Sequence, residues 1–387
     1  MISVSKLYCD GAAWGDALRY DARARDAGAP RPVVVWNATR RCNLRCAHCY
    51  AASTPAAEAG ELTTDEARAM IDDLAAFGAP VLLLSGGEPL LREDLPGLVD
   101  HARLAGLRTA LSTNATPVTV GAAARLAEAG LAYAGVSFDG PPEAHDAFRG
   151  QDGAFDEAVA GLRAFRAAGV RVGLRFTVTA DNARHVTTMF DLARREGIDR
   201  LCFYHLVATG RAATTGRAPS HAVTRRVVDE ILGATVRARQ RGTPLEVLTV
   251  DNHADGPYIY LRLLGESPAR AERCLRRLRR QGGNASGERI ACIGWGGDVH
   301  PDPFWRTQVL GNVRDRPFSE IWSDAGDGLL AALRSRPAPL RGRCTRCRWL
   351  DVCNGNLRGR AEAAGDTWGD DPACYLTDEE IRRDDDE

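Results

Sequence analysis

The sequence predicts an α/β fold: an incomplete TIM-like barrel of six β/α units, followed by a smaller C-terminal extension that contains cysteines. Two observations carry this prediction. From about residue 33, short apolar runs alternate with amphipathic helical stretches, which is the pattern of repeated β/α units around a parallel sheet. Six units are too few to close an eight-stranded barrel, so we expect one side to stay open and the chemistry to lie at the carboxyl ends of the strands.

Each expected strand is a short apolar run. The six runs cover residues 33–36, 81–84, 109–112, 134–138, 172–178 and 201–206. The first helix is bounded by a capping box of Thr63 and Glu66 and by Gly78 at its end. Amphipathic stretches predict further helices over residues 95–104, 121–128, 155–167 and 185–195.

The alternation of strands and helices breaks after residue 207, where Gly, Pro and Arg become frequent. We therefore expect the chain to divide into five segments. They are an N-terminal extension (1–32), the partial barrel (33–210), a helical connector (211–285), a compact cysteine-bearing domain (286–376) and an acidic, disordered tail (377–387).

Composition and charge favour a folded, cytoplasmic protein. The 387 residues are 44% hydrophobic, and 50 basic residues nearly balance 51 acidic ones, so no general attraction to nucleic acid or to a membrane is expected. The first thirty residues lack the apolar core of a signal peptide, and no later stretch is long enough to span a membrane. Most of the 11 cysteines are clustered, which favours metal binding over disulfides.

The first cysteine group follows the first expected strand. Cys42, Cys46 and Cys49 lie on one loop at the end of the barrel where chemistry is expected. Three soft thiolates can hold three corners of a 4Fe-4S cluster and leave the fourth iron open to a ligand. The alternative is a structural zinc site with His48 or a distant residue as fourth ligand.

The second strand ends in Gly86, Gly87, Glu88 and Pro89, where paired glycines let the backbone approach a ligand closely. Cys-x3-Cys-x2-Cys followed by Gly-Gly-Glu-Pro resembles the radical S-adenosylmethionine superfamily. The resemblance implies that S-adenosylmethionine binds the open iron through its amino and carboxylate groups and is cleaved to a 5′-deoxyadenosyl radical. It also implies that the Gly-Gly-Glu-Pro turn binds the amino group.

Polar residues end the third and fourth strands, at the same mouth of the barrel. Asn114, Ser137 and Asp139 could there bind the ribose and the methionine carboxylate, although ordinary turns also favour these residue types. Family members often have Asn-Gly-Thr where this chain has Asn114, Ala115 and Thr116, so we expect that turn to differ.

A second cysteine group consists of Cys344, Cys347, Cys353 and Cys374. Four thiols can close either a 4Fe-4S cluster or a zinc ribbon. The region resembles the SPASM or twitch extension of radical enzymes, which implies auxiliary clusters. Asp302 stands where a cysteine is usual in a full SPASM domain, so we expect one auxiliary 4Fe-4S cluster only. The remaining cysteines are expected to be buried, inert thiols.

Longer segments point to a substrate. Residues 2–9, 16–20, 250–257, 300–305, 310–313 and 371–380 resemble the didecarboxysiroheme deacetylase and heme d1 synthase family. The resemblance implies that acetates are removed from 12,18-didecarboxysiroheme, giving iron coproporphyrin III in alternative heme biosynthesis, with a reductase, flavodoxin or ferredoxin as electron donor. In the heme d1 branch, propionates are removed instead.

Two other functions stay open. A peptide-modifying SPASM enzyme commonly carries a leader-recognition domain, for which the residues before the first strand are too few. An iron-sulfur electron carrier or a zinc-binding interaction module would not need the open three-cysteine site.

An iron tetrapyrrole is a flat apolar disc with carboxylates at its rim and a metal at its centre. A pocket for it needs aromatic walls, arginines and a histidine. Without a role in substrate binding, His205 would be a strand residue whose hydrogen bonds are satisfied within the protein, and His300 would be a turn residue. The candidates are Tyr204, His205, Arg211, His253, His300, Trp305 and Arg306.

Overall fold

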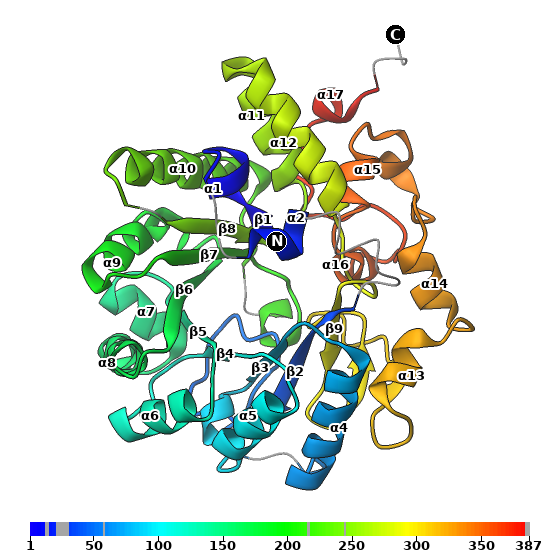
Figure 1. Cartoon of the computed structure of the whole chain (residues 1–387). Coiled ribbons are helices and arrows are strands. Elements are labelled where there is room, and N and C mark those ends of the chain that lie inside the picture. The colour runs from blue at the N-terminus through cyan, green and yellow to red at the C-terminus, as the bar shows by residue number, and fades with distance from the viewer. Residues whose placement is uncertain (12–14, 21–30, 57–58, 215–216, 244, 384–387) are drawn as a thin grey trace.

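The computed structural model describes residues 1–11, 15–20, 31–56, 59–214, 217–243 and 245–383. Within these residues, one curved sheet of eleven strands forms the centre of the molecule (Figure 1). Six parallel strands confirm the six that the sequence predicts. They are β2 (Val33–Thr39), β3 (Leu82–Gly86), β4 (Thr109–Thr113), β5 (Tyr133–Ser137), β6 (Arg171–Val178) and β7 (Arg200–His205).

The sheet extends beyond these six strands on both sides. β8 (Glu246–Val250) pairs in parallel with β7, and β9 (Ile290–Ile293) pairs in parallel with β2. Three short strands complete the sheet in antiparallel pairing, namely β1 (Ile2–Ser3), β10 (Asp298–His300) and β11 (Gly311–Asn312). The described sheet therefore has two ends, β1 and β11, and stays open as expected.

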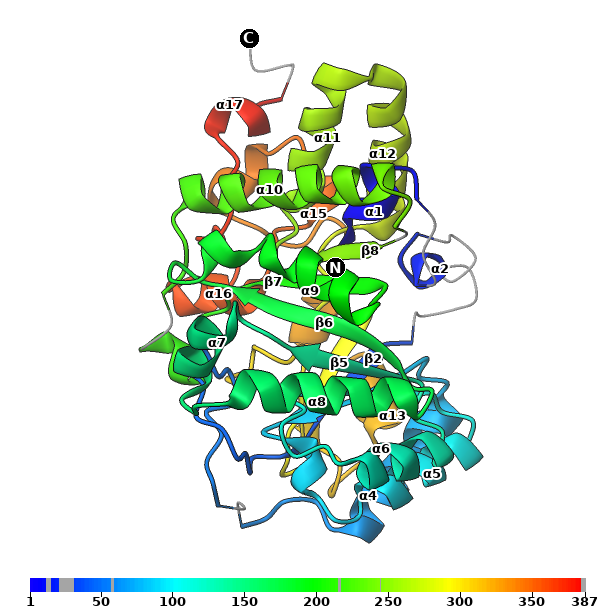
Figure 2. The same cartoon turned by 90° about the vertical axis from the view of Figure 1, so that its left-hand side faces the viewer.

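Helices cover the outer face of the sheet (Figures 1 and 2). α4 (Thr64–Phe77) has the predicted capping box of Thr63 and Glu66, and Gly78 ends it with φ of 83°. The other predicted helices also form, and α7 (Pro142–Arg149) is an additional one. The predicted helices are α5 (Leu95–Leu104), α6 (Val120–Glu128), α8 (Ala154–Ala167) and α9 (Thr188–Glu196).

The expected helical connector contains helices but also the strand β8. Its helices are α10 (His221–Gln240), α11 (Asp255–Glu266) and α12 (Pro268–Gln281). Residues 245–250 read Leu-Glu-Val-Leu-Thr-Val, an apolar run like the earlier strands, but they lie outside the regular alternation of the barrel. The sequence analysis missed β8 for this reason, and the division into domains stays a prediction.

After β9, short helices and irregular loops make up most of the C-terminal part of the chain, on the right-hand side of Figure 1. The helices are α13 (Phe318–Ser323), α14 (Gly328–Arg334), α15 (Leu350–Cys353) and α16 (Arg358–Ala363). The expectation of a disordered tail is wrong for α17 (Asp378–Ile381), which Thr377 and Glu380 begin with a capping box. Arg225 holds this helix against α10 through a 2.8 Å ion pair with Glu380. Residues 384–387 lie outside the described residues.

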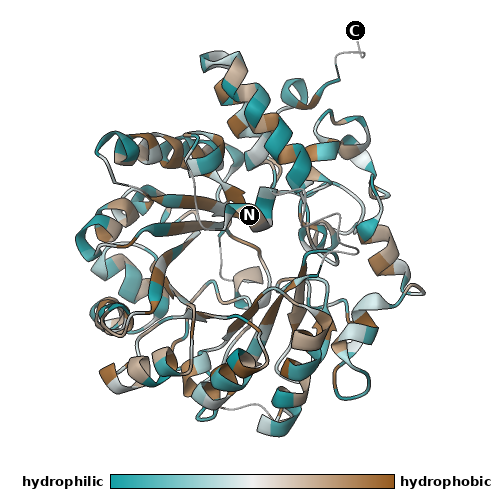
Figure 3. Ribbon diagram, in the orientation of Figure 1, coloured by the Kyte–Doolittle hydropathy of each residue, from teal (hydrophilic) through white to brown (hydrophobic). Residues whose placement is uncertain are grey.

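The core fills the space between the sheet and its helices. Hydrophobic residues are frequent along the strands (Figure 3). Its largest buried side chains include Trp36, Phe138, Phe165, Phe176 and Phe203. None of the described helices is both long and apolar enough to cross a membrane.

Candidate active site

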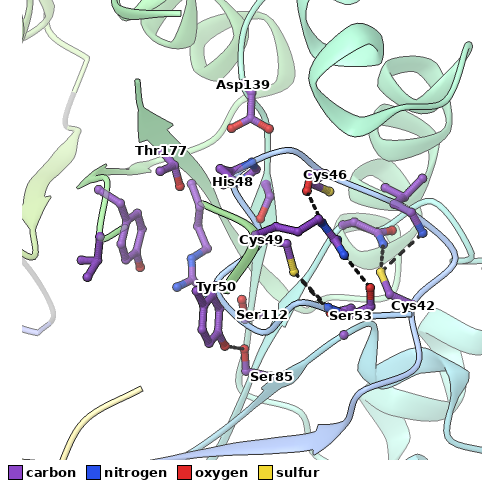
Figure 4. Close-up of a pocket in the computed structure, with 18 of the residues that line it drawn as sticks. Cys42, Cys46, His48, Cys49, Tyr50, Ser53, Ser85, Ser112, Asp139 and Thr177 are labelled. Atoms are coloured by element: carbon purple, nitrogen blue, oxygen red, sulfur yellow. Dashed lines mark hydrogen bonds between the residues drawn. The ribbon is translucent and has the colours of Figure 1, made fainter. Parts of the chain in front are cut away.

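The first cysteine group lies where the sequence places it, on the loop that follows β2. Cys42, Cys46 and Cys49 all line one cavity at the carboxyl ends of the strands (Figure 4). Burial raises the pKa of Cys42 to about 12 and also raises that of Cys46. Such thiols become thiolates when positive charge, such as that of iron, compensates for the burial.

The cysteine loop is fastened by an arginine from beyond β7. Arg211 donates from Nε to the carbonyl oxygen of Cys46 (3.0 Å) and from Nη1 to that of Ser53 (2.7 Å). It lines the cavity, as expected of a substrate residue, but its guanidinium is engaged with the loop. His48, the fourth ligand of the zinc alternative, also lines the cavity and stacks on Phe148 with ring centroids 4.6 Å apart.

The two glycines after β3 let that strand approach the base of the cysteine loop. Gly87 donates to the carbonyl oxygen of Thr39 at 2.7 Å, and a Cβ on Gly87 would lie 2.1 Å from the carbonyl oxygen of Arg41. A Cβ on Gly86, whose φ is 127°, would lie 2.4 Å from the Thr39 oxygen. Both glycines line the cavity. Only glycine fits these two positions without a shift of backbone.

Glu88 and Pro89 lie behind the cavity wall rather than on it. The carboxylate of Glu88 is fully buried and accepts hydrogen bonds from Thr113 Oγ1 (2.7 Å) and from the Asn114 amide (2.8 Å), so it ties the turn to the end of β4. Burial raises the pKa of Glu88 to about 7, against the effect of these hydrogen bonds. Pro89 is buried at the start of a 3-10 turn.

Asn114 lines the cavity beside the cysteine loop. Its Nδ2 lies 3.9 Å from Cys42 Sγ and donates to Asn43 Oδ1 at 3.1 Å. Ala115, which follows it, has φ of 61° in the left-handed region that glycine prefers. The turn thus has a conformation that a glycine would adopt, with an alanine in its place. That this turn differs from the one in family members with Asn-Gly-Thr stays a prediction.

Ser137 and Asp139 also line the cavity, but Asp139 is already paired. Its carboxylate forms a 2.6 Å ion pair with Arg149, and Arg149 Nη1 lies 3.6 Å from Cys46 Sγ. Burial raises the pKa of Asp139, but the charge of Arg149, the nearby His48 and His145, and the hydrogen bond from Arg149 together outweigh burial and lower it overall. The pair therefore places a positive charge beside a cysteine sulfur.

A second, larger cavity adjoins the first. It has a volume of about 330 Å³, and apolar residues of the strands form much of its wall. The residues that line both cavities are Arg175, Tyr204, Asp251 and Phe304. Sequence analysis predicted only Tyr204 among these four. Alternation along β6 could have found Arg175, whereas Asp251 follows the unpredicted strand β8.

Three more of the predicted substrate residues have distinct positions. His205 lines the first cavity, and its Nε2 lies 2.8 Å from Asp255 Oδ2. His253 lines the second cavity, where burial lowers its pKa well below the ordinary value. Arg306 lies over the ring of Trp295 at 3.9 Å and lines neither cavity.

The other two predicted residues are occupied in the C-terminal part of the chain. His300 Nδ1 lies 2.8 Å from the carbonyl oxygen of Gln308. Trp305 is buried against Gly359, where an added Cβ would lie 3.1 Å from the indole. Neither residue lines the two cavities. The sequence around His300 did not reveal this, because the group that His300 contacts is a backbone carbonyl of its own loop, which any residue type supplies.

The second cysteine group gathers in the C-terminal part. Cys353 follows the loop of Cys344 and Cys347, and burial, followed by the nearby thiols of Cys374, Cys344 and Cys347, raises its pKa well above the ordinary value. Among the residues that the structure describes, no three Cys, His, Asp or Glu side chains are arranged to hold a single metal ion.

Asp302, which stands where a cysteine is usual in the resembling SPASM domains, has a structural role here. Its Oδ2 accepts from Ser286 Oγ at 2.6 Å, and its Oδ1 accepts from the amides of Phe304 (2.8 Å) and Trp305 (3.0 Å). These bonds shape the turn that presents Phe304 to both cavities. Ser286, Asp302 and the turn form one buried hydrogen-bonded unit.

Comparison with known proteins identifies the family. The model of the radical SAM superfamily matches residues 36–207. The chain is 50% identical over 394 residues to the "Fe-coproporphyrin III synthase" of Methanosarcina barkeri, covering 98% of this chain and 99% of that protein. It is 46% identical over 354 residues to the "Pre-heme d1 synthase" of Dinoroseobacter shibae, covering 90% and 87%.

A solved structure agrees in fold. Streptococcus suis SuiB bound to its precursor peptide SuiA superposes with a TM-score of 0.70 at 17% identity, covering 92% of this chain and 79% of that one. At this identity the likeness concerns the fold alone. The chain belongs to the radical SAM superfamily and, within it, to the family that includes these two synthases.

Proposed function

We propose that this enzyme removes two peripheral acetates from 12,18-didecarboxysiroheme and so produces iron coproporphyrin III in alternative heme biosynthesis. The observation that carries the proposal is the near full-length identity of 50% to the Methanosarcina barkeri protein named Fe-coproporphyrin III synthase. Identity of this extent covers both the barrel and the C-terminal cysteine region. The adjoining cavities support a substrate that is larger than an amino acid side chain.

The superfamily uses a 4Fe-4S cluster and S-adenosylmethionine, and the first cysteine group fits such a cluster. Cys42, Cys46 and Cys49 offer three buried thiols to one cavity, with Gly86 and Gly87 on its wall. When bound there, the cluster and S-adenosylmethionine supply a carbon radical that abstracts hydrogen. We place S-adenosylmethionine against these glycines, Asn114, Ser137 and Asp139.

Residues around the site fix the backbone of the cysteine loop and balance the charge of its thiols. Arg211 fixes the backbone of the cysteine loop, and Glu88 fixes the end of β4 beside it. Arg149 offsets negative charge at Cys46 while Asp139 orients its guanidinium. These contacts position the thiols before any cofactor binds, which lowers the cost of ordering them.

The second cysteine group is proposed to hold one auxiliary 4Fe-4S cluster. Cys344, Cys347, Cys353 and Cys374 supply four thiols, which would leave no iron open to substrate. Such a cluster suits electron transfer or structural support. A reductase, flavodoxin or ferredoxin is the proposed electron donor, and the cytoplasm is the proposed compartment.

Mass spectrometry of the product tests the proposal. Reconstituted enzyme is incubated without oxygen with dithionite, S-adenosylmethionine and 12,18-didecarboxysiroheme. Loss of two acetates is the expected result. Loss of propionates would instead assign the reaction of the heme d1 branch, to which a relative with 46% identity belongs by name. Formation of 5′-deoxyadenosine with an unchanged tetrapyrrole would refute the proposed substrate and leave the radical chemistry standing.

A further inference from the structure

Arg175 occupies the wall between the two cavities. It lies on β6, pairs with Ser137 of β5 in the sheet, and lines both cavities. Alternation along the strand turns Arg175 and Thr177 to the same inner side, and Thr177 lines the first cavity as well. The guanidinium is therefore accessible to a molecule that extends from the cysteine loop, in the first cavity, into the second cavity.

Two facing glycines make room for Arg175 and for the neighbouring Tyr133. Gly135 and Gly173 are direct partners on β5 and β6. A Cβ on Gly135 would lie 2.7 Å from Arg175 Cδ, and a Cβ on Gly173 would lie 2.2 Å from the Tyr133 hydroxyl. Glycine in the interior of a strand weakens the strand and often marks a close approach. Both positions are thus adapted to the large side chains inside the sheet.

The guanidinium of Arg175 forms no ion pair with an Asp or Glu in the described part of the chain. The Cζ atom of Arg175 lies over the ring of Tyr204, 4.7 Å from its centroid. Other arginines that line the cavities are engaged within the protein, including Arg108. Their partners are Glu246 for Arg19 and Arg200, Asp139 for Arg149, the Gln281 carbonyl for Arg289 and the cysteine loop for Arg211.

A guanidinium carries five N–H donors in a planar fork that matches a carboxylate. Withdrawing such a charge from water is costly unless an acceptor meets it. The protein supplies Tyr204 as a flat support for one face of Arg175 and leaves the donor edge to the cavities. A bound anion would therefore be recognised there, and carboxylates are the anionic groups of the proposed substrate.

We propose that Arg175 binds a peripheral carboxylate of the tetrapyrrole and so sets which side chain lies beside the cysteine loop. The inference rests on the proposed function and adds the residue that binds and orients the substrate. The second cavity then accepts the apolar face of the ring system, whereas Arg175 binds one carboxylate at the edge of the ring.

Substitutions at one strand test the role. Arg175→Gln removes the charge, Arg175→Lys keeps the charge but loses the fork, and Arg171→Gln serves as a matched control. Arg171 lies on the same strand, at its other end, and pairs with Asp199 at 3.2 Å. Each variant is reconstituted, and its iron content and its cleavage of S-adenosylmethionine without tetrapyrrole are measured first to establish an intact radical site.

Binding of 12,18-didecarboxysiroheme is then followed by its visible absorbance. We expect Arg175→Gln to weaken binding roughly 10- to 100-fold, Arg175→Lys to restore part of it, and Arg171→Gln to bind as the wild type does. Esterified tetrapyrrole should bind the wild type and Arg175→Gln alike. Unchanged binding by Arg175→Gln would overturn the inference, and so would a loss of affinity for S-adenosylmethionine with tetrapyrrole binding intact.

A stability measurement separates binding from folding. Because Arg175 pairs with no acid among the described residues, Arg175→Met should raise the melting temperature of the substrate-free protein. A marked fall would show that Arg175 supports the fold rather than the ligand, and would overturn the inference. Failure of the wild type to bind or convert the tetrapyrrole would refute the proposed function itself, whereas wild-type conversion with unchanged Arg175→Gln affinity refutes only the role of Arg175.

Discussion

His205 Nε2 lies 2.8 Å from Asp255 Oδ2, and this contact joins the end of β7 to the beginning of α11. Asp255 is fully buried and also accepts a 2.6 Å hydrogen bond from the hydroxyl of Tyr375. Burial raises the pKa of Asp255, but the facing His205 and these hydrogen bonds outweigh burial and lower it. One carboxylate thus connects a residue of the first cavity to the neighbour of Cys374.

Removal of the Asp255 carboxylate should lower the free energy of unfolding more than removal of the Tyr375 hydroxyl, which is one of its donors. Tyr375→Phe deletes one hydrogen bond and is expected to lower the free energy of unfolding by about 1 kcal/mol. Asp255→Ala leaves the half-buried His205 and the buried Tyr375 without their shared partner and should lower it by about 3 kcal/mol or more. Urea unfolding of the iron-free protein measures both. Equal effects would contradict the central place of Asp255.

Gly87→Ala should disturb the first cysteine group. The added Cβ would lie 2.1 Å from the Arg41 oxygen, directly before Cys42, so the loop must move. We expect loss of about half the iron and of S-adenosylmethionine cleavage. Gly97→Ala on α5 is the matched control, because a Cβ there has no neighbour within 4 Å. The control should keep its iron and gain about 0.5 kcal/mol of stability. Full iron binding by Gly87→Ala would argue against the close approach.

Glu88 predicts a pH dependence of stability. Burial raises its pKa from 4.5 to about 7, so between these values the folded protein binds a proton that the unfolded chain has lost. The contribution of Glu88 to the free energy of unfolding therefore falls as pH rises from 4.5 to about 7, by at most about 1.4 kcal/mol per pH unit. Glu88→Gln cannot titrate and should show a flatter curve in urea unfolding of the iron-free protein. An unchanged slope would assign the pH dependence elsewhere.

Iron and zinc analysis tests the second cysteine group. Two 4Fe-4S clusters predict about eight iron atoms per chain, and Cys344→Ser should retain about four. Cleavage of S-adenosylmethionine without substrate should persist in that variant, because Cys42, Cys46 and Cys49 are unchanged. A wild type with about four iron atoms and one zinc would favour the zinc ribbon instead.

Much of the barrel was predictable because its signals are local. Helix α4 shows this best, since its capping box and terminal Gly78 lie within a few residues of the helix they define. The six parallel strands were likewise read from apolar runs of a few residues each. The position of Cys42, Cys46 and Cys49 after β2 needed only the order of a strand and a motif.

Other features depended on residues far apart in the sequence. β9 pairs with β2 through Val33 and Ile290, and β1 pairs with β8 through Ile2 and Thr249, so both extensions of the sheet are non-local. No pattern within a short window specifies such partners. The C-terminal helix α17 has a local capping box of Thr377 and Glu380, but its position against α10 depends on the distant Arg225, which pairs with Glu380.

By itself, the sequence determined the parallel α/β order, the cysteine spacings and the glycines that let β3 approach the cysteine loop. Only the tertiary structure decided which polar groups remain available in the cavities. It paired Asp139 with Arg149 and turned Glu88 toward β4, but within the described residues it left Arg175 beside Tyr204 with no ion pair to an acid. The physical reason is that residue type sets what a side chain can bind, whereas its neighbours in space determine whether that capacity is already used.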